Sequence, residues 1–226
     1  MSLGSAISRG PWDFPEKTTV LGRYVQLEPL SAEHIDDLWA AASTAPDSFT
    51  YLRYGPFETR HHLAELIADL STRKDQPFWT VLGVEGRAEG WPSICDVYQR
   101  DGAFEIGSIW FAPSLQGSRE AREAIFLLMC VGMDDLQYER LVWRCQAQNE
   151  RSFRAAINLG FTHEGTWRNA MIYQNWQRDI AWFSILRNEW PQCRNALLKW
   201  LLPENFDETG QQKVRLQDLR RESEGL

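Results

Sequence analysis

The spacing of apolar residues predicts two amphipathic helices in the first third of the chain. At residues 32–43 and 60–73, apolar side chains recur every three or four positions, which places them on one face of a helix. Ser31 and Thr59 stand at the starts of these segments, where a hydroxyl can cap free backbone N–H groups. An alternating run at 23–29 predicts a first strand, and the segment before it is predicted to be an irregular arm.

The middle of the chain changes to a strand pattern. Apolar-rich runs at 78–85, 91–98 and 103–111 are separated by short turn-like segments, so they predict an antiparallel meander. A long helix is predicted after residue 118, with an apolar face that continues to Leu136. A strand at 140–147 follows that helix, and the unit 103–147 is the expected parallel crossover.

The last third of the chain is predicted to contain two helices, two strands and a polar tail. The predicted elements are a helix at 149–160 closed by Gly160, strands at 161–174 and 178–186 around a turn at 175–177, a helix at 189–201 and a polar tail at 203–226. The predicted fold class is therefore α+β (mixed α/β), with a mainly antiparallel sheet.

Composition narrows the classes of function. Basic residues number 24 and acidic residues 31, which gives a net charge of −7 and argues against a nucleic-acid partner. The four cysteines (Cys95, Cys130, Cys145 and Cys193) are far apart, so neither a metal site nor a disulfide framework is expected. Neither a membrane-spanning run nor a signal segment is visible, and a cytoplasmic protein without a membrane partner is expected.

The segment SLQGSREAREA, residues 114–124, lies between a predicted strand and a predicted helix. A helix start offers unpaired N–H groups and a partial positive charge, and small residues there allow an anion to approach the backbone. The natural ligand is a phosphate or diphosphate. An ordinary strand-to-helix turn fits the same residues equally well, so the pattern alone leaves both interpretations open.

A series of short motifs in order resembles the GNAT superfamily of acyl-CoA-dependent N-acyltransferases, and more narrowly its ribosomal-protein N-terminal (Rim-type) branch. The resemblance covers roughly residues 20–192. It implies a twisted, mostly antiparallel sheet of about six to seven strands, flanked by helices, in which strands 103–111 and 140–147 splay apart. The motifs are Glu105-Ile106-Gly107, Trp110, Pro113, Gln116-Gly117, Glu123-Ala124, Asn149-Glu150-Arg151-Ser152, Leu159-Gly160-Phe161, Glu164-Gly165, Arg168, Arg178-Asp179 and Glu189-Trp190-Pro191.

The resemblance also implies a set of groups that bind coenzyme A. The start of the central helix would hold the diphosphate, the backbone of the first splayed strand would pair with the pantetheine arm, and the next helix would contact the arm and the phosphates. Arg119 stands where the family has a glycine; if residue 119 is already helical, its side chain adds a cation beside the diphosphate. The expected residues are Trp110, Phe111, Gln116, Gly117, Ser118, Arg119, Glu120, Ala121, Asn149 and Arg151.

Two catalytic residues are expected, Ser152 near the thioester sulfur and Glu105 as the general base. The phenol that many GNAT enzymes use would fall at Ala156, and the carboxylate of Rim-type enzymes would fall at Met171, so neither usual group is present. Glu105 is the substitute base, because burial can raise a carboxylate pKa toward neutrality. Direct binding of the neutral amine, with water carrying the proton, is an alternative to this base.

The predicted activity is transfer of acetyl from acetyl-CoA to a primary amine, with a non-catalytic acyl-CoA-binding or regulatory protein as the alternative. The domain prediction is an arm at 1–20, an acyltransferase domain at 21–192, and a helix with a polar tail at 193–226.

His61, His62, His163, Glu164 and Asp179 are expected to be structural or at the surface. The apolar residues of the 189–201 helix (Leu197, Leu198, Trp200 and Leu201) could pack on a second copy of the chain as a homodimer. Five aromatic residues fit either an acceptor groove or packing: Phe49, Tyr51, Tyr54, Trp167 and Tyr173.

Overall fold

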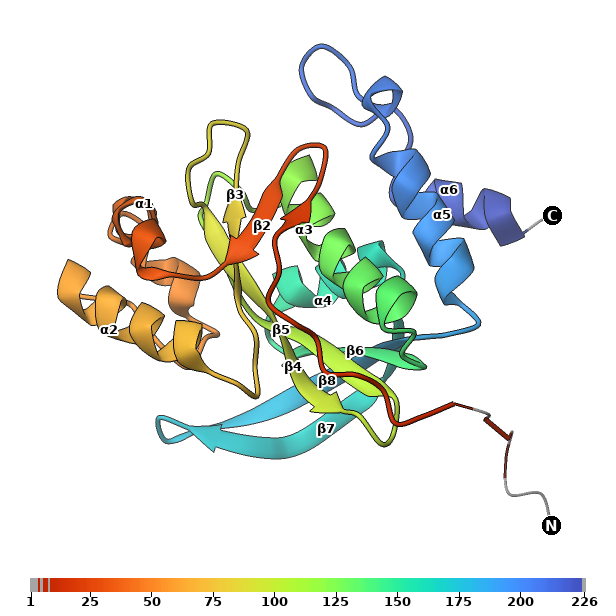
Figure 1. Cartoon of the computed structure of the whole chain (residues 1–226), viewed down its shortest axis with the longest axis horizontal. Coiled ribbons are helices and arrows are strands. Elements are labelled where there is room, and N and C mark those ends of the chain that lie inside the picture. Colours follow the sequence, from red (N-terminus) through yellow and green to blue (C-terminus); the bar gives the residue numbers. More distant parts are fainter. Residues whose placement is uncertain (1–3, 5, 8, 225–226) are drawn as a thin grey trace.

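The protein is described here by a computed structural model that covers residues 4, 6–7 and 9–224. Parts of the predicted arm and the last two residues of the tail lie outside the described residues. Two sheets form the centre of the molecule (Figure 1). The smaller has the order β1-β2-β3, with β1 at Val20–Leu21, β2 at Gln26–Pro29 and β3 at Trp79–Leu82. It meets the larger sheet through an isolated bridge between Phe78 and Ser93.

The larger sheet has five strands in the order β4-β5-β6-β8-β7. Their bounds are β4 Gly90–Tyr98, β5 Ala103–Phe111, β6 Arg140–Gln146, β7 Thr162–Tyr173 and β8 Trp176–Leu186. Every neighbouring pair is antiparallel except β5 and β6, which run parallel. The fold class and the parallel crossover predicted from the sequence are confirmed.

The parallel pairing between β5 and β6 stops early. It covers three pairs, Ala103–Arg140, Phe104–Leu141 and Glu105–Val142, although both strands continue. Beyond Glu105 the two strands diverge, so the backbone groups of β5 on that side have no strand opposite them. The predicted splay between these strands is present, and it opens at Glu105.

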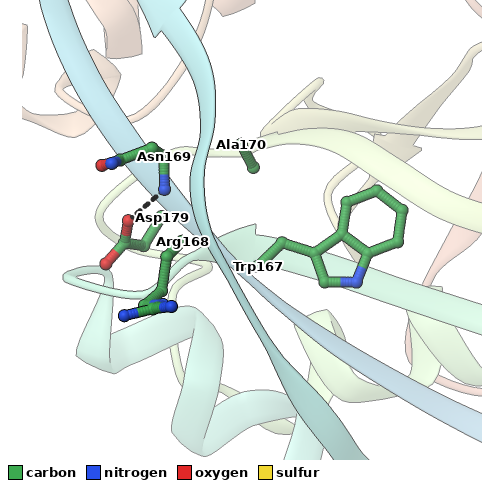
Figure 2. A pocket seen from close by; sticks show the side chains of 5 residues that line it. All are labelled: Trp167, Arg168, Asn169, Ala170 and Asp179. Atoms are coloured by element: carbon green, nitrogen blue, oxygen red, sulfur yellow. Dashed lines mark hydrogen bonds between the residues drawn. The ribbon is translucent and has the colours of Figure 1, made fainter.

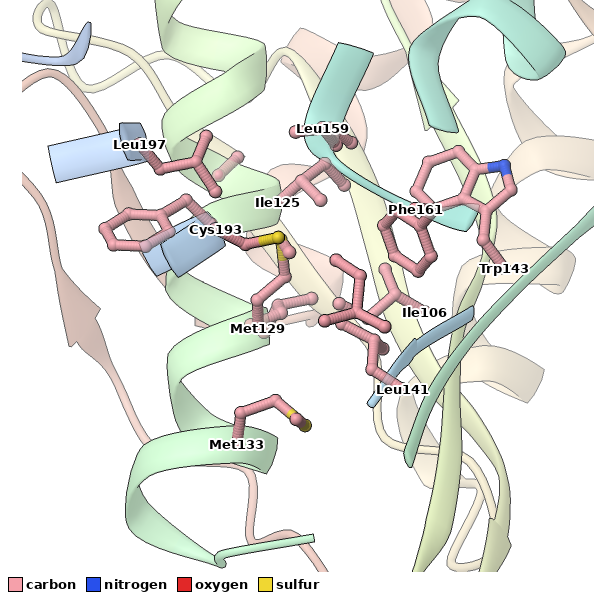
Figure 3. Close-up of a cluster of buried hydrophobic side chains, with 14 of the residues drawn as sticks. Ile106, Ile125, Met129, Met133, Leu141, Trp143, Leu159, Phe161, Cys193 and Leu197 are labelled. Carbon is pink, nitrogen blue, oxygen red and sulfur yellow. The ribbon is translucent and has the colours of Figure 1, made fainter. Parts of the chain in front are cut away.

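Helices cover the two faces of the sheets unequally (Figure 1). On one face, α3 (Arg119–Cys130), α4 (Glu150–Leu159) and α5 (Trp190–Trp200) pack over the main core. Figure 3 shows that core, in which Ile106 and Leu141 meet Ile125, Leu159 and Leu197. On the other face, α1 (Ile35–Ala42) and α2 (Arg60–Thr72) enclose a second core with Trp91 and Trp110. Among the described residues, no helix is long and apolar enough to cross a membrane.

Several predicted boundaries were wrong. Strand β1 lies in the segment predicted to be an irregular arm, and β7 and β8 turn at residues 174–175 rather than 175–177. The central α-helix ends at Cys130 and continues as a π-helical turn, Val131–Asp135. Gly132 lies in that turn, where a Cβ would come within 2.0 Å of the Phe104 ring. Close packing against β5 therefore determines the residue and the geometry at this point.

The arm and the tail are both packed onto the domain. Trp12 is buried in the main core, and its indole donates to the carbonyl of Gln137 at 2.8 Å. The predicted polar tail contains an unpredicted helix, α6 (Leu216–Glu224), whose Arg220 donates to the carbonyl of Ile157 at the end of α4. Helix α5 begins at Trp190 and so crosses the predicted domain boundary at residue 193.

The surface proposed for a homodimer is largely occupied within this chain. Leu197, Trp200 and Leu201 are buried against the main core, and only Leu198 of that set is exposed. The apolar pattern of this helix is therefore explained by its packing in the main core. It gives no separate support for a dimer.

Candidate functional site

The start of α3 has the geometry of an anion-binding turn. Ser118 is the N-cap, and its hydroxyl accepts a hydrogen bond from the Ala121 N–H at 2.9 Å. Gly117 carries the positive φ of the turn, at 74°. Among the described residues, the N–H groups of Gly117, Arg119 and Glu120 have no hydrogen-bond acceptor. Three free donors at a helix start are suited to a phosphate or diphosphate.

Arg119 is the first residue of α3, so its backbone is helical without strain. Its guanidinium stacks on the Tyr24 ring at 3.7 Å from the centroid and pairs with Glu120 at 3.1 Å. The side chain is 28% exposed. Because of these contacts, the Arg119 side chain is not a freely solvated cation. Arg119 also causes no backbone strain at the turn, because Gly117 occupies the left-handed position.

Side chains from the turn before α3 and from α4 meet near the end of β5. The Gln116 amide donates to the carbonyl of Phe111, at the end of β5, at 2.9 Å. The same amide accepts a weak hydrogen bond from Arg151, on α4, at 3.4 Å. Gln116, Phe111 and Arg151, three of the residues expected to bind coenzyme A, are therefore close together. The side chain of Trp110 is buried in the second core and stacks on Phe49, and its backbone is paired with Trp91 of β4.

The start of α4 lies on the opposite side of the splay. Asn149 is its N-cap and accepts from the Ser152 N–H at 3.1 Å. The Ser152 hydroxyl accepts from the Trp143 indole at 3.0 Å, so its own proton can be donated, and the neighbouring Cys145 sulfur is its partner in this structure. Ser152 also faces the thiol of Cys145, whose pKa is raised by burial. Ala156, one turn further, is fully buried and faces the core, which leaves no space for a phenol.

Glu105 lies where the splay opens, with its carboxylate 8% exposed. Burial raises the pKa of this carboxyl from its ordinary value of 4.5 to about 7, while the adjacent Arg144 guanidinium acts in the opposite direction. Arg144 lies on β6 and contacts both Glu105 and Asp96. A carboxyl of this kind is half ionised near pH 7, as general-base chemistry requires.

The strand β5 contains a bulge close to Glu105. Two residues, Ser108 and Ile109, lie opposite the single residue Pro92 of β4, and Ser108 has a φ of 50°. The hydroxyl of Tyr54, from the loop between α1 and α2, donates to the Ser108 carbonyl at 3.0 Å. Tyr54 was expected to line a groove or pack; its contact with the bulge could not be predicted from sequence spacing.

The face of the sheet that carries Glu105 continues as a ladder of side chains. The Arg144 guanidinium lies 4.8 Å from the centroid of Trp182, and Trp182 lies 4.4 Å from Trp167, which is 60% exposed. Figure 2 shows a shallow pocket at the neighbouring bulge of β7, where Asp179 accepts from the Asn169 N–H at 2.7 Å. Asp179 is thus occupied in holding the bulge, in agreement with its expected structural role.

The other residues considered in the sequence analysis lie outside the splay or have structural contacts. Glu164 is paired with Arg140, which lowers its pKa, and it accepts from Ser184, so it is structural as expected. Met171 lies on β7 three residues before the hairpin turn at 174. Of the five candidate groove aromatics, Phe49 is buried, Tyr54 is partly buried, Tyr173 contacts Arg178, and Tyr51 and Trp167 are exposed. His61 and His62 are at the surface.

One buried carboxylate had a role that the sequence did not reveal. Glu123 on α3 accepts hydrogen bonds from the N–H groups of Arg23, Tyr24 and Val25, at 2.9, 2.6 and 3.0 Å. It therefore fixes the turn before β2 to α3, the helix whose start has the three free N–H groups. No group of three or more His, Cys, Asp or Glu in the described part of the chain is placed to hold a metal ion.

A two-sheet α+β fold with splayed parallel strands and free N–H groups at the start of the central helix is typical of a class of acyltransferases. Residues 25–162 match the family model of the acetyltransferase (GNAT) domain, and the chain belongs to the GNAT family. The resemblance seen in the sequence is confirmed, as is the prediction of an N-acetyltransferase.

Three relatives show the range of similarity. The crystal structure of a GCN5-related N-acetyltransferase from Brucella melitensis is 39% identical, with a TM-score of 0.92, and the match covers 95% of this chain and 99% of that one. YdaF of Bacillus subtilis (strain 168), whose name assigns it provisionally as a ribosomal N-acetyltransferase, is 22% identical over 73% of this chain and 90% of its own length. The uncharacterized N-acetyltransferase YnaD of the same organism is 28% identical over 41% of this chain, a match that spans 54% of YnaD.

Proposed function

We propose that the chain transfers an acetyl group from acetyl-CoA to a primary amine, either a peptide N-terminus or a small-molecule amine, by direct attack. The observation that carries this proposal is the placement of three free N–H groups at the start of α3 beside the unpaired edge of β5. The first feature suits a diphosphate. The second suits an amide-bearing arm that pairs as an additional strand would.

The donor fits the residues around the splay. Gln116, Gly117, Ser118, Arg119, Glu120 and Ala121 would surround the diphosphate, of which Gly117, Arg119 and Glu120 offer the free N–H groups. The backbone of Phe111 would pair with the pantetheine arm, and the Gln116 amide must then leave the Phe111 carbonyl, whereas the backbone of Trp110 faces β4. Asn149 and Arg151 would approach the arm and the phosphates from α4.

The proposed chemistry requires a neutral amine. Glu105 takes the proton from the ammonium form, and the amine nitrogen then attacks the thioester carbonyl carbon. The C–N bond forms, the C–S bond breaks, and CoA leaves as a thiolate beside the Ser152 hydroxyl, which donates a hydrogen bond to the sulfur. The nitrogen loses its remaining excess proton, which is relayed by the Ser152 hydroxyl to the thiolate, so the products are the N-acetylated amine and the CoA thiol. Backbone N–H groups of β5 stabilise the oxyanion. Ser152 is not a strong acid, so much of the rate comes from holding the reactants together.

The decisive experiment is a thiol-release assay with acetyl-CoA and a panel of amines, run beside calorimetry with CoA. Turnover with at least one amine, detected also as an acetylated product by mass spectrometry, is the expected result. CoA binding without turnover across the panel would support the non-catalytic alternative. Absence of CoA binding would refute both.

The remaining parts of the proposal concern context. We expect residues 21–192 to form the acyltransferase domain, onto which the arm and the C-terminal segment pack. A cytoplasmic location is in keeping with the dispersed cysteines, all four of which are free among the described residues. The net charge of −7 suits a cationic acceptor better than a nucleic acid.

A further inference from the structure

Ser108 adopts a backbone conformation that its residue type disfavours. Its φ of 50° lies in the left-handed region, which costs a non-glycine residue about 1–2 kcal/mol. Such conformations persist where the surroundings impose them, and they concentrate at functional sites. The bulge lies three residues beyond Glu105, on the edge of β5 that the splay leaves free.

Two side chains hold Ser108 from outside the strand. Tyr54 donates its hydroxyl hydrogen to the Ser108 carbonyl at 3.0 Å, and it receives the Trp91 indole N–H at 2.9 Å. The Gln76 amide donates to the Ser108 hydroxyl at 3.0 Å and to the Ser93 hydroxyl at 2.9 Å. Burial raises the pKa of Tyr54 well above its ordinary value, so the phenol remains a donor at any physiological pH.

The Tyr54 contact determines where the next N–H group points. In a trans peptide the C=O and the following N–H lie on opposite sides, so fixing the Ser108 carbonyl on Tyr54 directs the Ile109 N–H away from it. The alternation of backbone groups along β5 gives the same direction for the Ile109 N–H. The Ala112 N–H donates to the Glu89 carbonyl of β4 at 2.8 Å, so the backbone groups of Trp110, two residues earlier, also face β4. The backbone groups of Ile109, which lies between these positions in the alternation, face the splay.

We propose that Tyr54 is a positioning residue that aims the Ile109 N–H at the thioester carbonyl oxygen. The inference rests on the proposed function, because it needs an acyl thioester between β5 and β6. It adds a specific donor and the side chain that orients it. Tyr54 acts through the Ser108–Ile109 peptide and does not itself touch the reacting atoms.

Tyr54→Phe removes one hydroxyl and keeps the ring, and Tyr138→Phe is its matched control. The Tyr138 ring is buried, and its hydroxyl also donates to a backbone carbonyl, that of Asp13, at 3.0 Å, in the main core. We expect Tyr54→Phe to lower kcat by about 10- to 100-fold, since misplacement of a group by about 1 Å has effects of this size. The Kd for CoA, which lacks the carbonyl, should stay within about twofold in both variants.

A second readout does not need turnover. The infrared band of the thioester carbonyl in bound acetyl-CoA, labelled with ¹³C, should lie at lower frequency in the wild type and in Tyr138→Phe than in Tyr54→Phe. Equal kcat values and equal band positions in the two variants would overturn the role of Tyr54. A wild type that fails to bind CoA would overturn the proposed function and this inference together. Binding without turnover leaves the infrared comparison decisive.

Discussion

Replacement of Arg144 tests whether Glu105 is the general base and whether its neighbour tunes it. Arg144 contacts the Glu105 carboxylate directly and holds its pKa below the value that burial alone would give. Removing an opposite charge at this range raises a carboxylate pKa by about one to three units. In Arg144→Gln we therefore expect the acid limb of the kcat/KM profile to move from about pH 7 to about pH 8–10.

The size of the effect at neutral pH follows from the ionised fraction. With a pKa of about 7, half of the Glu105 carboxyls are ionised at pH 7. With a pKa of about 8 to 10, between about a tenth and about a thousandth are ionised, so the rate at pH 7 falls by about 5-fold to about 500-fold. The loss is recovered at high pH, which separates it from a loss of active protein.

The assay is thiol release from acetyl-CoA over pH 5.5 to 10, with a single amine of known pKa for all variants. Arg140→Gln is the control, because Arg140 lies on the same strand and pairs with Glu164 rather than with Glu105. Its profile should coincide with that of the wild type. An unmoved limb in Arg144→Gln, or an equal shift in Arg140→Gln, would refute the reasoning.

Three further predictions concern stability and binding. The raised pKa of Glu105 gives the folded state a stabilising contribution that is present below pH 4.5 and is lost as the pH rises through about 7. In denaturant titrations, the free energy of unfolding of the wild type, relative to that of Glu105→Gln, should therefore fall by about 3 kcal/mol between pH 3.5 and 8.5. The same pH dependence in both proteins would contradict this prediction. Arg119→Glu should weaken CoA binding by about tenfold or more in calorimetry, and should cost about 1 kcal/mol of stability because the stacking on Tyr24 is lost; unchanged affinity would remove Arg119 from the site. Gly132→Ala should destabilise the fold by about 1–3 kcal/mol, since its Cβ would collide with the Phe104 ring, and an unchanged melting temperature would show that the π-helical turn can shift.

The parts of the site that depend on local chemistry could be predicted from the sequence. Ser118 as a cap and Gly117 before it specify a helix start within a few residues, and the structure confirms that Arg119 begins the helix. Asn149 and Ser152 are likewise close in sequence, and both occur at the start of α4. The GNAT resemblance added what spacing could not supply, namely the expectation that both helix starts contact the same coenzyme A molecule.

The parts that depend on distant contacts could not be predicted. Tyr54 and Gln76 lie in loops, 54 and 32 residues away from Ser108, and a serine gives no sequence signal for a left-handed bulge. Helix α6 has few apolar positions, and its stability comes from packing on α4 and α5. Pattern analysis therefore described it as a polar tail.

The order of the larger sheet limits where the chain can be shortened for recombinant work. The GNAT match ends at residue 162, but β8, which pairs with β6 along seven residues, lies beyond it. A truncation at that boundary would leave β6 with a bare, aggregation-prone edge. It would also remove Arg220 from the carboxyl end of α4, the helix that begins with Asn149. Soluble fragments should therefore extend through α6, and affinity tags should be separated from that helix by a flexible spacer.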